Sequence, residues 1–510
     1  MIIENIILDI DCEDGDAVAE AERRLNKLGK SAESPSRIYK KAIDARHKNN
    51  IKFVYSVIFG DAGKREINIA RVSEIKQEYR PVIIGFGPAG MFCALVLAEH
   101  GYKPVIFEMG DDIDRRVVKI ERLFKHGIID ARTNVCFGEG GAGTFSDGKL
   151  MTRINDPLCG FVLDSFVKFG ADERILYQAK PHIGTDKIRL IVKNIREQII
   201  KLGGEINFNS ELTDIKPEAN EVIINNADKY KTGGLFLAAG HSSFRLYDLL
   251  ASKGFAVEPK AYSVGVRIEH KQSYIDELAY GRYAGHKNLP PAEYQLSHKK
   301  DTRGVYSFFM CPGGTVVNSA SEDGGLVTNG MSCSSRDGLN ANAAVAVSVL
   351  PEDYGASVTD AFDFRRRIEE SAFNIKNSFT APVQTLGDYI NNRTGNLSKS
   401  SIKPTFTGEI IEYDLNSLFP EFINESLKEG LKNFDNKMRG YFLEDAVLTA
   451  PETRTSSAVR VIRDKISLEA FGFAGIYVCG EGSGYAGGIT SSAVDGIKCA
   501  VKYMERYNYK

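Results

Sequence analysis

The sequence predicts an α/β fold whose central unit is built from discontinuous segments of the chain. Three apolar, strand-like runs each end in glycine: residues 82–84 lead into the turn GFGPAG, residues 235–240 end in Ala-Ala-Gly, and residues 475–480 end in Cys-Gly. Helix-like stretches follow the first and the third run. Strands that alternate with glycine turns and helices are typical of doubly wound α/β sheets, so we expect the three runs to belong to one domain.

The strongest pattern runs from residue 80 to residue 108, RPVIIGFGPAGMFCALVLAEHGYKPVIFE. Gly85 permits a tight turn, Gly87 lets the backbone approach a pyrophosphate, and Gly90 lets the helix pack closely on the strand. The helix start adds free N–H groups and a positive dipole end. Glu108 follows Gly90 by 18 positions, which suits the acid that binds a ribose hydroxyl. The pattern predicts a dinucleotide site that also includes Pro88, Ala89 and Met109.

Composition and charge narrow the class of protein. A chain of 510 residues is long enough for about three domains, and 43% hydrophobic with 26% charged residues is typical of a globular core. The formal net charge of −2 gives no global attraction to nucleic acid. The apolar run 82–98 could pass for a membrane span, but its three glycines and its proline favour a buried strand and helix. With no signal peptide or lipidation motif, we expect a cytoplasmic protein without a membrane partner.

Eight cysteines are scattered along the chain without a C-x-x-C pair. This distribution argues against a zinc site, an iron–sulfur cluster or a dithiol centre, so no metal is expected. Cys311 and Cys479 could take part in chemistry as thiols, although lone cysteines among apolar neighbours are usually packed and inert.

The chain divides into four predicted segments. Residues 1–78 form a small N-terminal α+β domain, residues 79–254 and 446–510 form the two parts of the dinucleotide-binding domain, and residues 255–445 form an inserted mixed α+β substrate or lid domain. The inserted segment is predicted from its many short strands and turns with helical stretches between them.

The N-terminal segment has four predicted elements: strands at residues 2–10 and 51–59, and helices at residues 16–28 and 36–48. The second helix is basic. Its region carries Arg37, Lys40, Lys41, Arg46, Lys48 and Lys52 against the single acid Asp44. Such a face could contact RNA or an acidic partner, whereas a solvated helix face is the more ordinary interpretation.

A charged segment and a glycine-dense loop follow the ribose acid. Arg115 or Arg116 could reach the pyrophosphate as a charge-assisted donor, or lie at the surface. The loop at residues 137–150, FGEGGAGTFSDGKL, satisfies G-x-G-x-x-G without a following helix, and satisfies G-x-x-x-x-G-K with Leu150 in place of the Ser or Thr that binds magnesium. We therefore expect a backbone-exposing loop that lies against a flat ligand. Its contacts would be Gly140, Gly141, Ala142, Gly143 and Thr144.

The last segment contains a further strand and helix. Residues 475–480 lead to Glu481, and Gly487, Gly488 and Ile489 open a helix with one apolar face. A glycine pair at a helix start can meet the edge of a ring, where the helix dipole favours negative charge. Because a reduced flavin carries negative charge near N1 and its C2 carbonyl, this helix start is suited to a flavin.

Together these blocks resemble the glutathione-reductase-type FAD flavoproteins, and more narrowly the bacterial FAD-dependent or NAD(FAD)-utilising dehydrogenase group. The matching blocks are GFGPAG with Glu108, NVCFGEGGAGTFSDGKL, KPHIGTDKIR, AAGHSS, FFMCPGGTVVNSASEDGGLVTNGMS, APETRTSSAVR and GIYVCGEGSGYAGGITSSAVDG. The resemblance implies a Rossmann-like, GR2-type FAD-binding domain with an inserted substrate or lid domain.

The resemblance also implies roles for single residues. Gly85, Gly87 and Gly90 would hold the pyrophosphate of FAD, and Glu108 the adenosine ribose. Glu481 would lie near the ribityl chain, residues 487–489 would meet the flavin ring, and the loop 138–149 would line it. The cofactor set is completed by Arg116, Ala239, Gly240 and Gly480. The chain lacks the second dinucleotide domain and the cysteine pair of the disulfide reductases, so a reductant such as NADH or NADPH would bind transiently in the substrate cleft.

Hydride transfer at flavin N5 needs orientation, a proton donor or acceptor and exclusion of water. His182 and His241 are candidate acid–base groups, and Lys149 could hydrogen-bond N5. Arg454 and Arg460 could clamp a substrate carboxylate or phosphate, or brace their loop. We expect an FAD-dependent oxidoreductase that acts on a small organic molecule. The alternative from another class is a flavin-bearing binding or RNA-associated protein.

Overall fold

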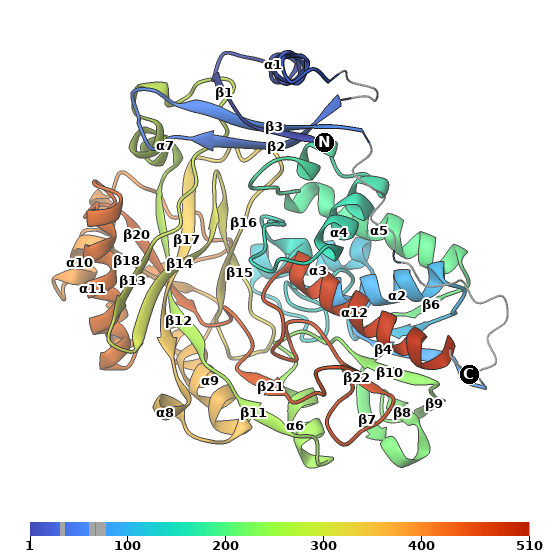
Figure 1. Ribbon diagram of the computed structural model, residues 1–510. Coiled ribbons are helices and arrows are strands. Elements are labelled where there is room, and N and C mark those ends of the chain that lie inside the picture. Colours follow the sequence, from blue (N-terminus) through green and yellow to red (C-terminus); the bar gives the residue numbers. More distant parts are fainter. Residues whose placement is uncertain (31–35, 61–66, 68–77, 509–510) are drawn as a thin grey trace.

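The computed structural model describes residues 1–30, 36–60, 67 and 78–508 of the chain. Three of its sheets organise the fold: a small N-terminal sheet, a parallel sheet of five strands and a mixed sheet of seven strands (Figure 1). Within these residues no helix is both long and apolar enough to cross a membrane. The architecture is mixed α/β.

The parallel sheet has the strand order β22-β10-β4-β5-β6. Its strands are β4 (Pro81–Ile84), β5 (Val105–Phe107), β6 (Glu205–Asn207), β10 (Gly234–Leu237) and β22 (Ile476–Val478). Leu235 pairs with Val82 on one side and with Ile476 on the other. Segments from three distant parts of the chain therefore lie side by side, as the three glycine-ended runs predicted.

Two layers cover the parallel sheet, because successive residues of a strand point to opposite faces. Ile83, Ile106 and Phe236 share one apolar cluster with the helices on their face. These helices are α2 (Pro88–Glu99), α4 (Leu158–Lys168), α5 (Thr185–Lys201) and α12 (Ile489–Asn508). On the other face lie helix α6 and a small antiparallel sheet, with α6 (Phe244–Ser252), β7 (Leu212–Lys216), β8 (Glu221–Ile224) and β9 (Asp228–Lys231). Helix α2 is buried all round, which explains its uniformly apolar sequence.

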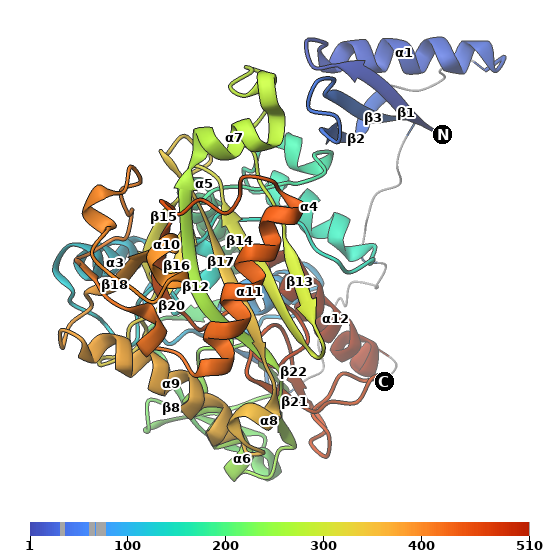
Figure 2. The same cartoon turned by 90° about the vertical axis from the view of Figure 1, so that its left-hand side faces the viewer.

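The inserted region is built on the seven-stranded sheet, with the order β13-β14-β17-β12-β20-β18-β19. Its strands are β12 (Tyr262–Lys271), β13 (Ser297–Lys300), β14 (Arg303–Cys311), β17 (Asn340–Val349), β18 (Ala381–Thr385), β19 (Ile410–Glu412) and β20 (Val447–Glu452). Figure 2 shows helix α11 (Glu421–Lys437) lying across this sheet. Strand β20 falls after residue 445, so the sheet extends beyond the boundary that the sequence placed there.

Shorter elements complete the fold. The helices are α3 (Ile113–His126), α7 (Gln272–Tyr280), α8 (Pro351–Tyr354), α9 (Val358–Asn374) and α10 (Leu386–Ile390). Two strand pairs stand apart from the large sheets: β11 (Val257–Pro259) with β21 (Val459–Val461), and β15 (Thr315–Asn318) with β16 (Thr328–Met331). The chain passes from the parallel sheet to the seven-stranded sheet through β11 and returns through β21. These two strands pair with each other.

The N-terminal sheet corrects one prediction, because the segment expected as a helix at residues 36–48 contains strand β2 (Ser36–Asp44). The other elements are β1 (Ile2–Asp9), α1 (Asp14–Lys27) and β3 (Lys52–Phe59), in the sheet order β1-β3-β2. Lysine, arginine and alanine favour a helix locally. Pairing with β3 from Ser36 to Asp44 outweighs that weak preference, as tertiary context often does.

Acids of the same domain pair with several of the basic side chains in this region. The pairs are Lys41 with Asp14 at 2.7 Å, Lys52 with Asp9, and Arg46 with Asp44. The basic helix face that suggested RNA contact is therefore not formed, and part of its charge is neutralised.

The N-terminal domain contacts both larger units. The Lys41 amide donates to the Tyr177 carbonyl at 2.7 Å, and the Lys41 carbonyl accepts from the Ala179 amide at 2.9 Å. On the other side, His286 Nε2 lies 3.1 Å from an Asp11 carboxylate oxygen. The small domain thus touches one segment that leads into helix α5 and another that leads into strand β13.

Candidate functional site

The carboxyl ends of β4, β10 and β22 meet at one edge of the parallel sheet. Gly85 follows β4, Ala239 and Gly240 follow β10 closely, and Gly480 follows β22 closely. Ligands of open α/β sheets bind outside this edge. The structure therefore brings three of the predicted binding segments together.

The turn after β4 has room for backbone only. Gly85 has a φ of +95°, and a Cβ there would lie 2.6 Å from the Ala238 carbonyl oxygen. A Cβ on Gly90 would lie 2.0 Å from the Gly85 oxygen. Helix α2 begins directly after Gly87, with proline as its first residue. Because the first N–H groups of a helix have no intrahelical acceptor, the two amides after this proline are available to an anion.

Glu108 is buried at the end of β5 and holds the turn together. Its carboxylate accepts the backbone amides of Phe86 at 2.8 Å, Gly138 at 2.9 Å and Gly110 at 3.0 Å. Met109, between two of these contacts, is half-buried. A carboxylate has about four lone-pair positions, so capacity for one further donor remains.

The first part of the glycine-dense loop lies directly on the glycine turn. The Gly140 amide donates to the Phe86 carbonyl at 2.8 Å. A Cβ on Gly141 would lie 2.9 Å from the Cα of Gly87. These contacts place residues 140 and 141 at the phosphate end of the predicted site, whereas the sequence suggested only the ring end.

The second part of the loop approaches helix α12. The loop forms a short 3₁₀ turn, η1 (Ala142–Phe145), and a Cβ on Gly143 would lie 2.9 Å from Cγ1 of Ile489. The Thr144 hydroxyl is buried and has no hydrogen-bond partner in the described part of the chain. The loop therefore runs from the start of one helix to the start of the other.

Arg116 braces this loop from beneath. The side chain is fully buried, and its guanidinium donates to the carbonyls of Asn134, Val135, Gly138 and Glu139 at 2.6–3.2 Å. Burial lowers its pKa to about 10, so the group stays charged at neutral pH. With its donors committed to four carbonyls, Arg116 is placed to shape the loop, and this geometry does not favour the predicted contact with a pyrophosphate.

The start of α12 is open. A Cβ on Gly487 would find no protein atom within 4 Å, and one on Gly488 would only reach Ser491 Oγ at 4.0 Å. Further along the helix the packing is tight, because a Cβ on Gly496 would lie 2.1 Å from the Ala89 carbonyl oxygen. Helices α2 and α12 thus touch through backbone, while the glycine pair before α12 faces free space.

His241 and Glu481 follow two neighbouring strands of the sheet, with Nε2 and Oε1 4.0 Å apart. Burial raises the pKa of Glu481 to about 7, against the influence of Lys260. Burial, and then the charges of Arg365 and Arg454, lower the pKa of His241 to about 3. At neutral pH a neutral imidazole therefore faces an acid that is partly protonated.

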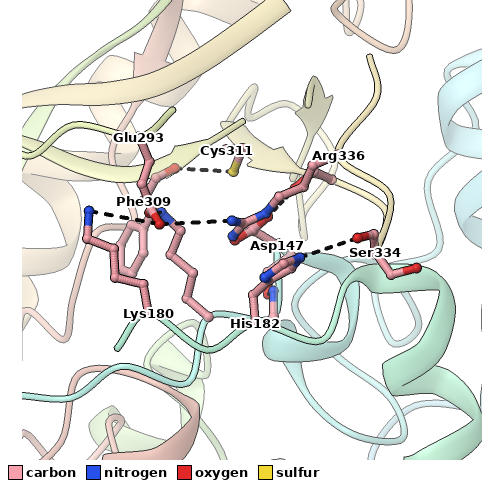
Figure 3. A network of polar contacts seen from close by, with 12 residues as sticks. Asp147, Lys180, His182, Glu293, Phe309, Cys311, Ser334 and Arg336 are labelled. Atoms are coloured by element: carbon pink, nitrogen blue, oxygen red, sulfur yellow. Dashed lines mark hydrogen bonds and ion pairs between the residues drawn. The ribbon is translucent and has the colours of Figure 1, made fainter. Parts of the chain in front are cut away.

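Lys149 and His182 lie opposite each other in an isolated backbone bridge. Lys149 Nζ is 2.7 Å from Glu293 Oε2. His182 Nε2 lies 3.4 Å from the Ser334 carbonyl oxygen, and since a carbonyl only accepts, this nitrogen carries the proton (Figure 3). Burial, reinforced by Arg336, lowers the pKa of His182, so the ring is neutral at neutral pH with its lone pair on Nδ1.

The same network contains residues that the sequence reasoning did not single out (Figure 3). The Arg336 guanidinium pairs with the Asp147 carboxylate, with Nε and Oδ1 3.0 Å apart, and Lys180 Nζ lies 4.0 Å from Glu293. Lys180 stands beside His182 in the KPHIGTDKIR block, which is the only local signal for it. Glu293 and Arg336 come from the inserted region, and no sequence pattern connects them to a loop more than 140 residues earlier.

The two arginines proposed as substrate clamps differ. Arg454 is buried, its side chain 7% exposed, and it pairs with Glu369 through contacts of 2.8 and 3.1 Å. This geometry favours bracing of the loop. Arg460, on β21, is exposed, and its closest polar contact is the Gly484 carbonyl at 3.4 Å.

Cys311 and Cys479 are both buried free thiols. Burial, followed by the charge of Asp147, raises the pKa of Cys311 to about 11. A thiol held in this state is not nucleophilic at neutral pH.

The residues at this edge fit FAD. The turn at Gly85 and Gly90 offers backbone amides for a pyrophosphate, Glu108 has capacity for a ribose hydroxyl, and Gly487 leaves free space at a helix start for a ring edge. Two buried atoms have no hydrogen-bond partner among the described residues: Thr144 Oγ1 in the glycine-dense loop, and His241 Nδ1 in the loop after β10.

Comparison with solved structures gives slight likenesses. A mutant of the halogenase PltM in complex with FAD is 14% identical with a TM-score of 0.38, covering 85% of this chain and 70% of that chain. Glycine oxidase from Bacillus cereus ATCC 14579 is 13% identical with a TM-score of 0.35, covering 84% of this chain and 96% of that chain. Likeness of this size transfers neither a reaction nor a substrate.

Sequence comparison is more informative. Residues 261–455 match the protein family described as "FAD-dependent protein, C-terminal domain-like". An uncharacterized protein of Clostridium beijerinckii (strain ATCC 51743 / NCIMB 8052) is 44% identical over 532 residues, covering 99% of each chain. The chain therefore belongs to the same family as this clostridial protein, and it is an FAD-dependent flavoprotein.

Proposed function

We propose that the protein is an FAD-dependent oxidoreductase of the glutathione-reductase type, with a GR2-type cofactor domain, which transfers a hydride between flavin N5 and a small organic substrate. The observation that carries this proposal is the convergence of two helix starts, after Gly87 and after Gly488, on one loop that touches both. Bound FAD would supply N5 as the hydride acceptor or donor.

Different residues of the chain would bind different parts of FAD. The amides at the start of α2 and loop residues 140 and 141 would hold the pyrophosphate, residues 142–144 would lie toward the ring, and Glu108 would accept a hydrogen bond from a ribose hydroxyl while it fixes the turn. Residues 487–489 offer the positive end of a helix to the ring. Arg116 acts on this set indirectly, through the loop that it braces.

His182 is the acid–base group that this geometry supports best. Its Nε2 proton is engaged by Ser334, so Nδ1 is the atom that can take a proton from a substrate. Lys149 lies opposite it in the same bridge, and the next carbonyl, that of Leu150, accepts a hydrogen bond from Thr490 in the first turn of α12 at 2.7 Å. His241 is the second candidate, because a pKa lowered to about 3 makes its imidazole a weak base.

The inserted region is placed to exclude water from the site around His182 and Lys149. Glu293 and Arg336 reach from it to the loop at Asp147 and Lys149, which covers this side of the site. We propose that this lid domain ends after β20, a few residues beyond 445, that NADH or NADPH binds transiently beneath it, and that the protein acts in the cytoplasm on a small molecule.

Anaerobic titration of the purified FAD-loaded protein with NADH and with NADPH tests the oxidoreductase proposal. We expect loss of the visible flavin absorbance with one of the two donors, and its return when an oxidised substrate is added. A protein that retains FAD, yet whose flavin is reduced by neither donor nor by any tested organic substrate, would contradict it. The RNA-associated alternative loses its main argument, because the expected basic helix is strand β2 and acids of the same domain pair with part of the basic charge in this region.

A further inference from the structure

We propose that Lys149, Lys180 and Arg336 form a binding site for the carboxylate of a small anionic substrate, and that Glu293 is the internal counter-ion of this site. The inference rests on the proposed function, because it names the substrate class of the same site.

Three cations from three separate segments converge on the Glu293 carboxylate, and two of them, Lys180 and Arg336, are labelled in Figure 3. Lys149 Nζ lies 2.7 Å from Glu293 Oε2, Arg336 Nη1 lies 3.9 Å from Oε1, and Lys180 Nζ lies 4.0 Å from Oε1. Lys149 belongs to the glycine-dense loop, Lys180 to the segment before α5, and Arg336 to the inserted region. A carboxylate is thus already surrounded by the donors that recognise one.

The charges of this cluster do not balance. Arg336 is paired with Asp147 and Lys149 with Glu293, which leaves Lys180 at the long distance of 4.0 Å from a shared oxygen. His182 adds no charge, because burial and the nearby Arg336 keep its pKa low. Three cations face two carboxylates, so one positive charge is unmatched within the cluster.

The unmatched charge is accessible. The side chain of Lys180 is 55% exposed, whereas those of Lys149 and Glu293 are 24% and 16% exposed. An anion that arrives from solvent therefore meets Lys180 first, with Lys149 behind it. Burial disfavours the charge on Glu293, yet the neighbouring cations hold its pKa below the usual value, which shows that their combined field favours a carboxylate.

The cluster also lies beside the catalytic elements. Lys149 is bridged to His182, and the residue after it, Leu150, is hydrogen-bonded to Thr490 at the start of α12. A substrate held by its carboxylate at Lys180 and Lys149 would lie next to the proposed acid–base group and close to the helix start proposed to meet the flavin.

A network that only joins the lid to the cofactor domain would respond differently to substitution. In an anion site, removal of Glu293 removes a competing negative charge, so Glu293→Gln should bind an added carboxylate more tightly. In a purely structural network the same substitution lowers stability and creates no affinity. Lys180→Gln removes a positive charge instead, so in an anion site it should weaken carboxylate binding. Its side chain is exposed and lies 4.0 Å from its partner Glu293.

Isothermal titration calorimetry of the FAD-loaded protein with benzoate, and with the uncharged benzamide of the same shape, tests the site. We expect benzoate and not benzamide to bind, with affinity about tenfold weaker in Lys180→Gln and about tenfold tighter in Glu293→Gln. Lys168→Gln is the matched control, because Lys168 is 57% exposed and pairs at 2.9 Å with Glu99, which is not part of the cluster.

Equal binding of benzoate and benzamide, or benzoate binding that neither cluster substitution changes, would overturn the anion site. Calorimetry requires no turnover, so the outcome is separate from that of the NADH and NADPH titration. Benzoate binding with a flavin that no donor reduces would support the anion site and refute the oxidoreductase proposal. A reducible flavin in a protein that does not bind benzoate would support the oxidoreductase proposal and refute the anion site.

Discussion

His241 and Glu481 face each other across the ends of two adjacent parallel strands, with Nε2 4.0 Å from Oε1. Burial shifts both groups toward their neutral forms, the pKa of His241 to about 3 and that of Glu481 to about 7. Between these two values the imidazole stays neutral, so only the carboxyl titrates near neutral pH. The pair therefore responds to pH through a single proton.

Glu481 should make the stability of the protein fall as pH rises. Its pKa of about 7 in the folded state lies above the ordinary 4.5, so the folded protein binds this proton more tightly than the unfolded chain does. The cost of ionising it is absent below pH 4.5, grows between pH 4.5 and 7 and reaches about 3 kcal/mol above that window. Glu481→Gln removes this cost.

Urea unfolding of the cofactor-free protein and of Glu481→Gln at about pH 5 and about pH 8 measures the effect. The free energy of unfolding of the variant relative to the natural protein should be higher at the upper pH. A constant difference at both values would show that Glu481 has an ordinary pKa.

Gly487→Ala should separate cofactor binding from folding. A Cβ at this position meets no protein atom within 4 Å, so the cofactor-free variant should unfold at the temperature of the natural protein. If the flavin ring lies against this residue, the added methyl group occupies its space and FAD affinity falls. Fluorescence titration with FAD and thermal unfolding without FAD give the two measurements.

Gly15→Ala is the control for this substitution, because Gly15 lies in α1 of the N-terminal domain and a methyl group added there also meets no atom within 4 Å. Gly15→Ala should leave FAD affinity unchanged, and any change in unfolding temperature should be a small rise, because alanine favours a helix more than glycine does. Unchanged FAD affinity in Gly487→Ala would remove this residue from the cofactor site.

Glu108→Ala should weaken FAD retention and loosen the loop at the same time. The substitution leaves three buried backbone amides without their acceptor, each at a cost of about 1–3 kcal/mol. Glu108→Gln keeps one acceptor oxygen, so its FAD occupancy should lie between that of the natural protein and that of Glu108→Ala. The ratio of flavin to protein absorbance after desalting measures occupancy, with Glu99→Ala at the far end of α2 as control. Full occupancy in Glu108→Ala would exclude it from the site.

Asp14→Ala should weaken the attachment of the N-terminal domain. Asp14 accepts hydrogen bonds from Lys41 at 2.7 Å, Tyr55 at 3.0 Å and Tyr177 at 3.3 Å, and so it ties the small domain to the segment that carries Lys180. Hydrogen exchange of residues 177–182 should become faster. Glu20→Ala removes an acid of the same helix whose partners, Arg23 and Arg24, also belong to α1, so it should leave that exchange unchanged. Equal rates in both variants would refute the attachment.

Local patterns were sufficient for the parallel sheet and its turns. Gly85, Gly90 and Glu108 could be identified because a tight turn, a close helix–strand contact and an acid at strand end each impose a residue type at a fixed spacing. The same reasoning placed α12 after its glycine pair, where the structure has Ile489–Asn508.

Long-range contacts decided the features that the sequence did not reveal. Strand β2 has a composition that suits a helix, and only its partner β3 makes it a strand. Nothing near Arg116 indicates that its guanidinium would meet four carbonyls of a loop about 20 residues away, and nothing near Lys149 points to Glu293, which is 144 residues further along the chain.

The order of synthesis adds a consequence of the contact between α2 and α12. Helix α2 is buried through ten consecutive residues, Ala89 to Ala98, yet α12, which covers it at Gly496, is made about 390 residues later. At about 5–20 residues per second, the ribosome needs roughly 20–80 s to cover that distance. During this interval the face of α2 that α12 covers has no partner on the nascent chain, although α5 can already pack on another face, and the two halves of the cofactor site cannot yet meet. A cofactor site that needs both helix starts is therefore complete only after α12 has been translated.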